Sequence, residues 1–188
     1  MSHKLIEALT EFIADEAQLT FNQTNNTIKI EEPENTGSKQ LRSVTLKGIS
    51  EFYFGLKLDH ERFQFLGRLL KEGRVRKAMD AILFCRMRKE GEKKAKDYVL
   101  LIELKSNDKG GIKEKIKSSK AFLGFIKVAL NQYYQIDLTS FIELSILFDR
   151  KVTKRGGLPD KIALGDATYF HKGFKKQDNE VWLREFLK

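Results

Sequence analysis

Two short apolar runs, each bordered by charge, constrain this chain most. Tyr98–Ile102 is an uninterrupted apolar run that leads directly into Glu103-Leu104-Lys105. Its length and composition predict a buried strand. Asp80 stands just before a second run of this kind, Ala81–Cys85. If the two strands pair as a hairpin, Asp80 and Glu103 meet at the same end of it.

The charges at this hairpin end need an explanation, because charged groups are costly to bury unless they are paired or hold a metal ion. Residues two apart in a strand point to the same face, so Glu103 and Lys105 are predicted to share one. The hairpin end then offers two carboxylates for a divalent cation, with one ammonium beside them. The alternative is structural: Asp80 caps a turn, and Lys105 pairs with one of the acids at a solvated strand end.

The composition favours a globular protein with an anionic partner. The chain has 188 residues, enough for one domain with a sizeable core, and 41% of them are hydrophobic. Lys and Arg outnumber Asp and Glu by 35 to 26, which gives a formal net charge of +9. A surplus of this size favours nucleic acid or an anionic membrane surface, although a lysine-rich surface also serves solubility alone.

Little in the sequence points to a membrane or to an oxidising compartment. No apolar run approaches the ~18 residues that span a bilayer, and the N-terminal segment lacks the pattern of a signal peptide. The sequence contains one cysteine, Cys85, so no disulfide can form within the chain. We therefore expect a cytoplasmic protein without membrane association, in which Cys85 is a small core residue.

The pattern along the chain predicts strands with helices between and around them. Helices are expected over 3–19, 59–73, 112–131 and 180–188. Strands are expected over 27–31, 77–88, 98–105 and 140–148, with one or two each within 43–58 and 162–174. Polar loops are expected at 32–38 and 150–161. This order predicts an α/β fold with a mixed central sheet.

An Asp that opens one strand, a Glu-x-Lys on the next and a basic helix afterwards resemble the core of the PD-(D/E)xK nuclease superfamily. Asp80, Glu103-Leu104-Lys105 and the helix from Ile112 carry the resemblance, which covers about residues 75–130. It implies a single restriction-endonuclease-like domain over 1–188, with a mixed central β-sheet flanked by helices. It also implies an endonuclease that requires Mg²⁺ or Mn²⁺ and acts on DNA more than on RNA, in a restriction or phage-defence system.

The resemblance also assigns roles. Asp80 and Glu103 would be metal ligands, together with the backbone carbonyl of Leu104. Lys105 would stabilise the attacking hydroxide or the developing negative charge, which makes Asp80, Glu103 and Lys105 the catalytic set. Family members also carry a Gln or Lys on the following helix, and Lys115 is the choice here. A further acid, often on an early helix, stays open among Glu7, Glu11, Asp15, Glu16, Glu51 and Glu61.

A line of lysines follows the motif. Their spacing places four of them on one face of the predicted helix: Lys113, Lys117, Lys120 and Lys127. Nucleic-acid backbones bind such lines through counterion release. A solvated helix face is the alternative, although like charges along one face are unfavourable without a partner. The predicted nucleic-acid contacts are Lys109, Lys113, Lys115, Lys117 and Lys120.

Functions from different classes stay open at this point. One is the metal-dependent nuclease, working with a larger protein partner or as a homodimer. Another is a catalytically silent subunit of the same fold that binds nucleic acid or protein. A chance match in an unrelated basic α/β protein is the third. The sequence contains no phosphate-binding GxxxxGKS/T loop and no zinc-ligand spacing of Cys and His, so neither a nucleotide-driven activity nor a zinc site is expected.

Overall fold

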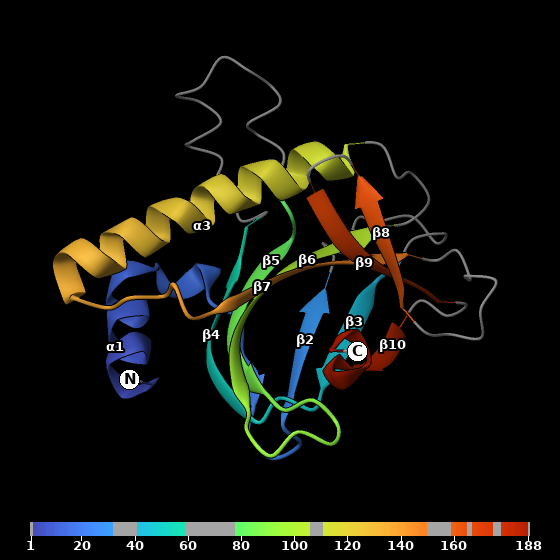
Figure 1. Cartoon of the computed structure of the whole chain (residues 1–188), viewed down its shortest axis with the longest axis horizontal. Helices are drawn as coiled ribbons and strands as arrows, with labels where there is room; N and C mark the ends of the chain where they lie inside the picture. Colours follow the sequence, from blue (N-terminus) through green and yellow to red (C-terminus); the bar gives the residue numbers. More distant parts are fainter. Residues whose placement is uncertain are drawn as a thin grey trace.

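Figure 1 shows the computed structural model of the chain, which contains helices and two mixed β-sheets. It describes residues 2–31, 41–58, 78–105, 111–149, 159–164, 167–174 and 178–187. The predicted α/β class with a mixed sheet is confirmed. The predicted loop at 32–38, the predicted helix over 59–73 and most of the predicted loop at 150–161 lie outside the described residues.

The bounds of most elements follow the apolar pattern. The helices are α1 (Ser2–Phe12) and α3 (Ile112–Tyr134), and the 3-10 turns are η1 (Asp15–Ala17) and η3 (Leu183–Phe186). The strands are β1 (Phe21–Asn22), β2 (Thr27–Glu31), β3 (Ser43–Lys47), β4 (Glu51–Lys57), β5 (Ala81–Met87), β6 (Lys96–Lys105), β7 (Ile142–Asp149), β8 (Asp160–Leu164), β9 (Ala167–Gly173) and β10 (Asp178–Trp182).

The larger sheet has six strands in the order β4-β5-β6-β7-β9-β8. Strands β4, β5 and β6 are antiparallel neighbours, so the predicted hairpin of β5 and β6 is confirmed. Strands β6, β7 and β9 run parallel to one another, and β8 returns antiparallel to β9. Consequently the C-terminal ends of β6, β7 and β9 lie at one edge of the sheet, together with the start of β5.

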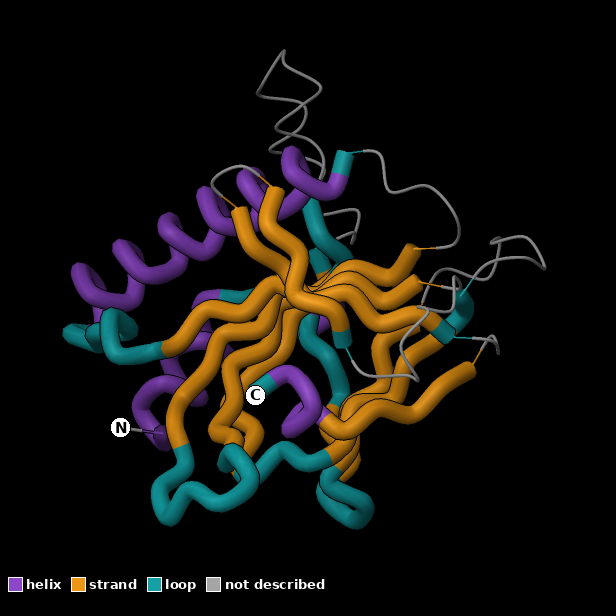
Figure 2. Tube along the Cα trace, turned by 45° about the vertical axis from the view of Figure 1, so that its right-hand side comes forward, coloured by secondary structure: helices purple, strands orange, loops and turns teal. Residues whose placement is uncertain are grey.

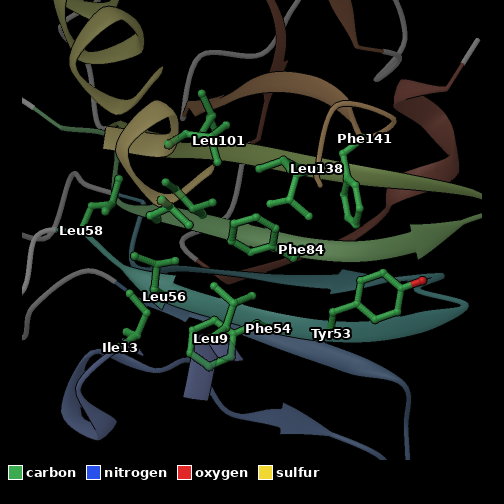
Figure 3. Close-up of a cluster of buried hydrophobic side chains, with 14 of the residues drawn as sticks. Leu9, Ile13, Tyr53, Phe54, Leu56, Leu58, Phe84, Leu101, Leu138 and Phe141 are labelled. Carbon is green, nitrogen blue, oxygen red and sulfur yellow. The ribbon is translucent and has the colours of Figure 1, made fainter. Parts of the chain in front are cut away.

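Helices cover one face of this sheet. Apolar residues of α1 and α3, among them Leu9 and Ile126, pack against one side of the sheet in a first core. Figure 3 shows Leu9 of α1 in this core, with Phe84 and Leu101 of the sheet. Figure 1 shows α3 laid across that face, with α1 beside its C-terminal half. α3 has 23 residues, about 35 Å at 1.5 Å per residue, so it reaches from one edge of the sheet toward the other.

A second sheet covers the other face, in the order β1-β2-β3-β10 (Figure 2). Side chains along its strands point alternately to the two faces of the sheet. Ile30 and Leu46 point into a second core with Leu100 and Phe148 of the larger sheet. The sequence pattern predicted helices around the central sheet. Within the described residues, helices cover one face and strands the other, because the alternating residues of β2 and β3 offer one apolar face that must be buried.

Two predicted helices differ from the structure. The first was expected over 3–19, but α1 ends at Phe12, and Leu19 is buried in the second core instead. The closing helix expected over 180–188 is wrong: β10 pairs in parallel with β3, and only a 3-10 turn follows it. In this segment Val181 and Leu183 are buried while Trp182 is exposed, an alternation typical of a strand.

Candidate functional site

The β5–β6 hairpin brings Asp80 and Glu103 together. Ala81 pairs with Ile102 in the antiparallel register, so the residues just beyond that pair lie beside each other. The backbone N–H of Leu104 donates a hydrogen bond to Oδ2 of Asp80. Glu103 is fully buried. The predicted meeting of the two acids is thus observed, and the alternative of a solvated strand end does not hold for Glu103.

The backbone on either side of Asp80 is fixed by two other elements. The N–H of Leu58, just after β4, donates to the carbonyl oxygen of Asp80 at 2.9 Å. The N–H of Met79 donates to Oγ of Ser119 in α3 at 2.8 Å. Both contacts hold the chain before β5 against the sheet and the helix. Asp80, which lies just before β5, is therefore attached to β4 and α3 through its own carbonyl and its neighbour Met79.

Lys115 of α3 reaches both acids. Its Nζ lies 2.5 Å from Oε1 of Glu103 and 3.9 Å from Oδ1 of Asp80. Ile112 and Ile116 are buried on the same helix, so the start of α3 is fixed against the sheet and directs Lys115 toward the hairpin end. The side chain of Lys115 is 24% exposed, which leaves this side of the site open to solvent. Lys115 was the residue predicted for this helix, and the structure brings it to the two acids.

The donor set fits a hard divalent cation. Two carboxylates that share one ammonium already form a site that binds positive charge, and oxygen ligands are those that Mg²⁺ and Mn²⁺ prefer. Among the described residues no three His, Cys, Asp or Glu side chains gather around one point. Mg²⁺ usually keeps several waters and is held by one or two carboxylates together with substrate phosphate. Asp80 and Glu103 would be the two protein carboxylates of such a site, and the proposed carbonyl ligand on Leu104 stays a prediction.

The other predicted site residues are placed only in part. The structure describes the backbone of Lys105, which is the last residue of β6 and lies opposite Asp149 of β7 in the parallel register. Lys109 lies outside the described residues. Lys117 and Lys120 are exposed on α3, and Lys113 is half-buried. Four of the five predicted phosphate contacts, Lys115 among them, therefore lie on α3.

Lys127 differs from the other lysines of α3. Its Nζ lies 2.6 Å from Oε1 of Glu143 in β7, and both side chains are about a third or less exposed. The sequence placed Lys127 on the same line as Lys113, Lys117 and Lys120. Because it is paired within the fold, Lys127 serves to join α3 to the start of β7.

Several of the acids that were candidates for the further acidic residue of the site take part in contacts elsewhere. Glu7 lies 3.3 Å from His3 within α1, and Asp15 accepts a hydrogen bond from Gln18. Glu11 accepts a hydrogen bond from Tyr134, which ends α3, about 28 Å along the helix from Lys115 at 1.5 Å per residue. Glu51 contacts Arg86 at the far end of β5. Glu16 is exposed beside α1, and Glu61 lies outside the described residues.

Sequence reasoning missed a buried pair at the same edge of the sheet. Asp149 ends β7 and His171 lies in β9, with His171 Nε2 3.5 Å from Asp149 Oδ2. The sequence pattern placed neither residue in the site. The available signal was the short apolar run Ile146–Phe148, which leads directly into Asp149 as Tyr98–Ile102 leads into Glu103.

No helix among the described residues is both long enough and apolar enough to cross a membrane. No protein family, no curated protein and no solved structure matches the chain.

Proposed function

We propose that the protein is a metal-dependent endonuclease that hydrolyses phosphodiester bonds, most readily in DNA, with Asp80, Glu103 and Lys105 as its catalytic residues. One observation carries the proposal: two acids from neighbouring strands converge on one cationic group at the strand end that Lys105 closes. The order of a strand opened by Asp80, a strand ending in Glu-Leu-Lys and a basic helix is also that of the PD-(D/E)xK core. A restriction-endonuclease-like domain over 1–188 is part of the proposal.

The chemistry follows from the residues at the hairpin end. Hydrolysis needs a water molecule that is activated for attack on phosphorus. It also needs neutralisation of the extra negative charge on the phosphate and stabilisation of the departing sugar oxygen. Asp80 and Glu103 would hold Mg²⁺ or Mn²⁺, which would supply charge neutralisation at the phosphate. Lys105 stabilises the attacking hydroxide or the developing charge. Lys115 contacts both carboxylates from the side of α3.

Substrate and setting rest on charge and on the family resemblance. The formal net charge of +9 favours an anionic polymer, and the exposed Lys117 and Lys120 of α3 extend positive charge from the site along the helix. A restriction or phage-defence role with a larger protein partner comes from the family resemblance. The cytoplasmic location suits the single cysteine, and a homodimer suits an enzyme that makes two cuts in a duplex. All of these belong to the proposal as its biological setting.

The test is cleavage of supercoiled plasmid and linear DNA in the presence of Mg²⁺ or Mn²⁺. The informative variants are Asp80→Asn, Glu103→Gln and Lys105→Ala. Asp80→Asn keeps an acceptor for the Leu104 N–H but removes the charge, so it separates catalysis from folding. Glu180→Gln is the matched control, because Glu180 is an exposed acid of the other sheet that pairs with Lys47.

Cleavage should require the metal, persist in Glu180→Gln and fall at least about 100-fold in each of the three site variants. Folding of each variant is checked by circular dichroism and thermal unfolding. Metal-dependent cleavage that survives in Asp80→Asn and Glu103→Gln would place the active site elsewhere. A folded wild type that cleaves neither DNA nor RNA with either metal would contradict the nuclease proposal.

A second candidate is the catalytically silent binding subunit, and the position of Lys115 favours it. An ammonium 2.5 Å from Glu103 neutralises the acids without a metal ion. Calorimetric titration with Mn²⁺ distinguishes the two. An enzyme binds Mn²⁺ in a manner that requires Asp80 and Glu103, whereas a silent subunit binds DNA equally well with and without metal.

A further inference from the structure

A buried acid–base pair lies beside the candidate site, outside the set of residues that the proposed chemistry uses. Asp149 is 1% exposed and His171 3% exposed, and Asp149 Oδ2 lies 3.5 Å from His171 Nε2. Burial of a charged group is unfavourable unless neighbours compensate for it. Replacement of such pairs by apolar residues is often neutral or stabilising, so stability alone does not account for this one.

The register of the parallel strands places this pair next to the Glu-Leu-Lys segment. Asp149 lies opposite Lys105 on the neighbouring strand, and Glu103, Leu147 and His171 form one row across β6, β7 and β9. Adjacent strands are about 4.8 Å apart, so the backbone of Asp149 is one strand away from that of Lys105. Asp149 is thus the acid that the sheet sets beside Lys105.

The pair also faces the same layer as the acids. Leu101, Leu147 and Tyr169 belong to the core beneath α3. Residues two further along each strand point to the same face, and these are Glu103, Asp149 and His171. The helix that carries Lys115 therefore covers both groups. Among the described residues, no group of three metal-ligating side chains includes this pair.

We propose that Asp149 is a positioning residue that acts through Lys105, and that His171 holds Asp149 in place. The proposal rests on the nuclease function proposed above and adds a second layer to that site. Asp149 supplies a negative charge on β7, next to the position of Lys105 on β6. No sequence motif connects Asp149 to Lys105. His171 supports this carboxylate from β9, on the side away from Lys105.

The experiment measures kcat and KM for plasmid cleavage with Mg²⁺, and Mn²⁺ affinity by calorimetry, in full-length variants. The set is Asp149→Asn, His171→Gln, His171→Ala, Lys105→Ala and the double variant Lys105→Ala/Asp149→Asn. Ser145→Ala is the matched control, because Ser145 is also a buried polar residue of β7 and precedes Asp149 on the same face of the strand. Thermal unfolding establishes that each variant is folded.

If Asp149 acts through Lys105, Asp149→Asn lowers kcat at least about 30-fold while KM stays within about threefold. Mn²⁺ affinity stays close to that of the wild type, because Asp80 and Glu103 are untouched. The double variant is no slower than Lys105→Ala alone, since coupled residues are not additive. His171→Gln, which keeps a polar group next to Asp149, retains more activity than His171→Ala. Should Asp149→Asn not fold, the two His171 variants carry the test.

Other outcomes overturn the inference while leaving the nuclease intact. One is full activity of Asp149→Asn. Another is a loss of kcat in the double variant equal to the product of the two single losses. The third is a loss of kcat that only follows the fraction of unfolded protein. Equal activities of His171→Gln and His171→Ala would remove His171 from the proposal. Absence of cleavage by both the wild type and Ser145→Ala would overturn the nuclease and this inference together, so the two failures are distinguishable.

Discussion

At the scale of single residues, the site consists of the ammonium of Lys115 and the two carboxylates that it contacts, Asp80 and Glu103. Asp80 and Glu103 could be predicted to meet because each borders an apolar run, and a hairpin aligns the ends of such runs. Lys115 could be chosen because it precedes a core-facing residue of the next helix. Asp149 and His171 could not be placed in this way, since they reach the site through pairing between strands that are distant in the chain.

Lys115 gives a residue-scale prediction about the metal. Its ammonium lies 2.5 Å from Glu103 and competes with any other cation for the two carboxylates. Lys115→Met removes that charge and keeps the length of the side chain. We expect Mn²⁺ to bind about fivefold more tightly or better, since two charges ~4 Å apart interact by about 1 kcal/mol even at the dielectric constant of water. Calorimetry measures the change.

Lys120→Met is the matched control for this measurement, because Lys120 is an exposed lysine of the same helix. Its Mn²⁺ affinity should equal that of the wild type. Weaker binding in Lys115→Met would mean that Lys115 holds the carboxylates in position more than it competes with the metal. No binding by either variant or by the wild type would contradict the metal site itself.

Cys85 gives a second residue-scale prediction. Its side chain is fully buried in the core between the two sheets. Burial raises the pKa of its thiol, and the nearby charge of Asp97 raises it further. Because the thiolate is the reactive form, a thiol reagent should label Cys85 only as fast as the protein unfolds. Rapid labelling of native protein, measured without denaturant, would contradict the buried position.

At the scale of secondary-structure elements, the sequence predicted best where a strand pairs with its neighbour in the chain. The β5–β6 hairpin and the helix over Ile112–Tyr134 follow from local apolar patterns. The closing segment was predicted as a helix because its charges and apolar residues also suit one. The segment forms a strand instead, because β10 pairs with β3 and buries Val181 against residues far away in the sequence. The local sequence pattern does not predict that contact.

The opposite end of the hairpin carries a network that joins three strands. Arg86 of β5 donates two hydrogen bonds to Asp97 of β6, and the Tyr53 hydroxyl of β4 donates another at 2.7 Å. Burial alone would raise the pKa of Asp97, but the hydrogen bonds from Arg86 and Tyr53 hold it below its ordinary value. The network therefore stabilises the fold while Asp97 is ionised.

This network gives an element-scale prediction about pH. A lowered pKa in the folded state adds stability above the unfolded pKa, about 3.9 for Asp, and that stability is lost as the pH falls through the folded pKa. Asp97→Asn should lower the free energy of unfolding by about 1–3 kcal/mol at pH 7. The difference from the wild type should narrow below about pH 4. Urea unfolding at several pH values measures it.

Tyr53→Phe is the milder comparison, because it removes one hydrogen bond and leaves both charges. We expect it to cost about 0.5–1.5 kcal/mol. A difference between Asp97→Asn and the wild type that stayed constant from pH 7 to pH 3 would show that the Asp97 carboxylate is not the source of the stability.

At the scale of the whole molecule, charge and architecture work together. The formal net charge is +9, and helices and the four-stranded sheet cover opposite faces of the central sheet (Figure 2). The candidate site lies on the helical side, where α3 also carries Lys117 and Lys120. Nucleic acid that reaches Asp80 and Glu103 would therefore pass along α3, and the four-stranded sheet would take little part in its binding.

Salt dependence of DNA binding tests this arrangement. Removal of one lysine that binds a phosphate should reduce the slope of log K against log salt concentration by about 1. Lys117→Ala/Lys120→Ala should therefore flatten the slope by about 2. The control Lys29→Ala/Lys96→Ala removes the same charge from β2 and from the start of β6, where each lysine pairs with a nearby acid. Its slope should stay within about 0.5 of the wild type, because long-range effects of exposed charges are screened within ~10 Å at 0.1 M salt. Equal changes of slope in both double variants would mean that net charge, rather than the α3 surface, governs binding.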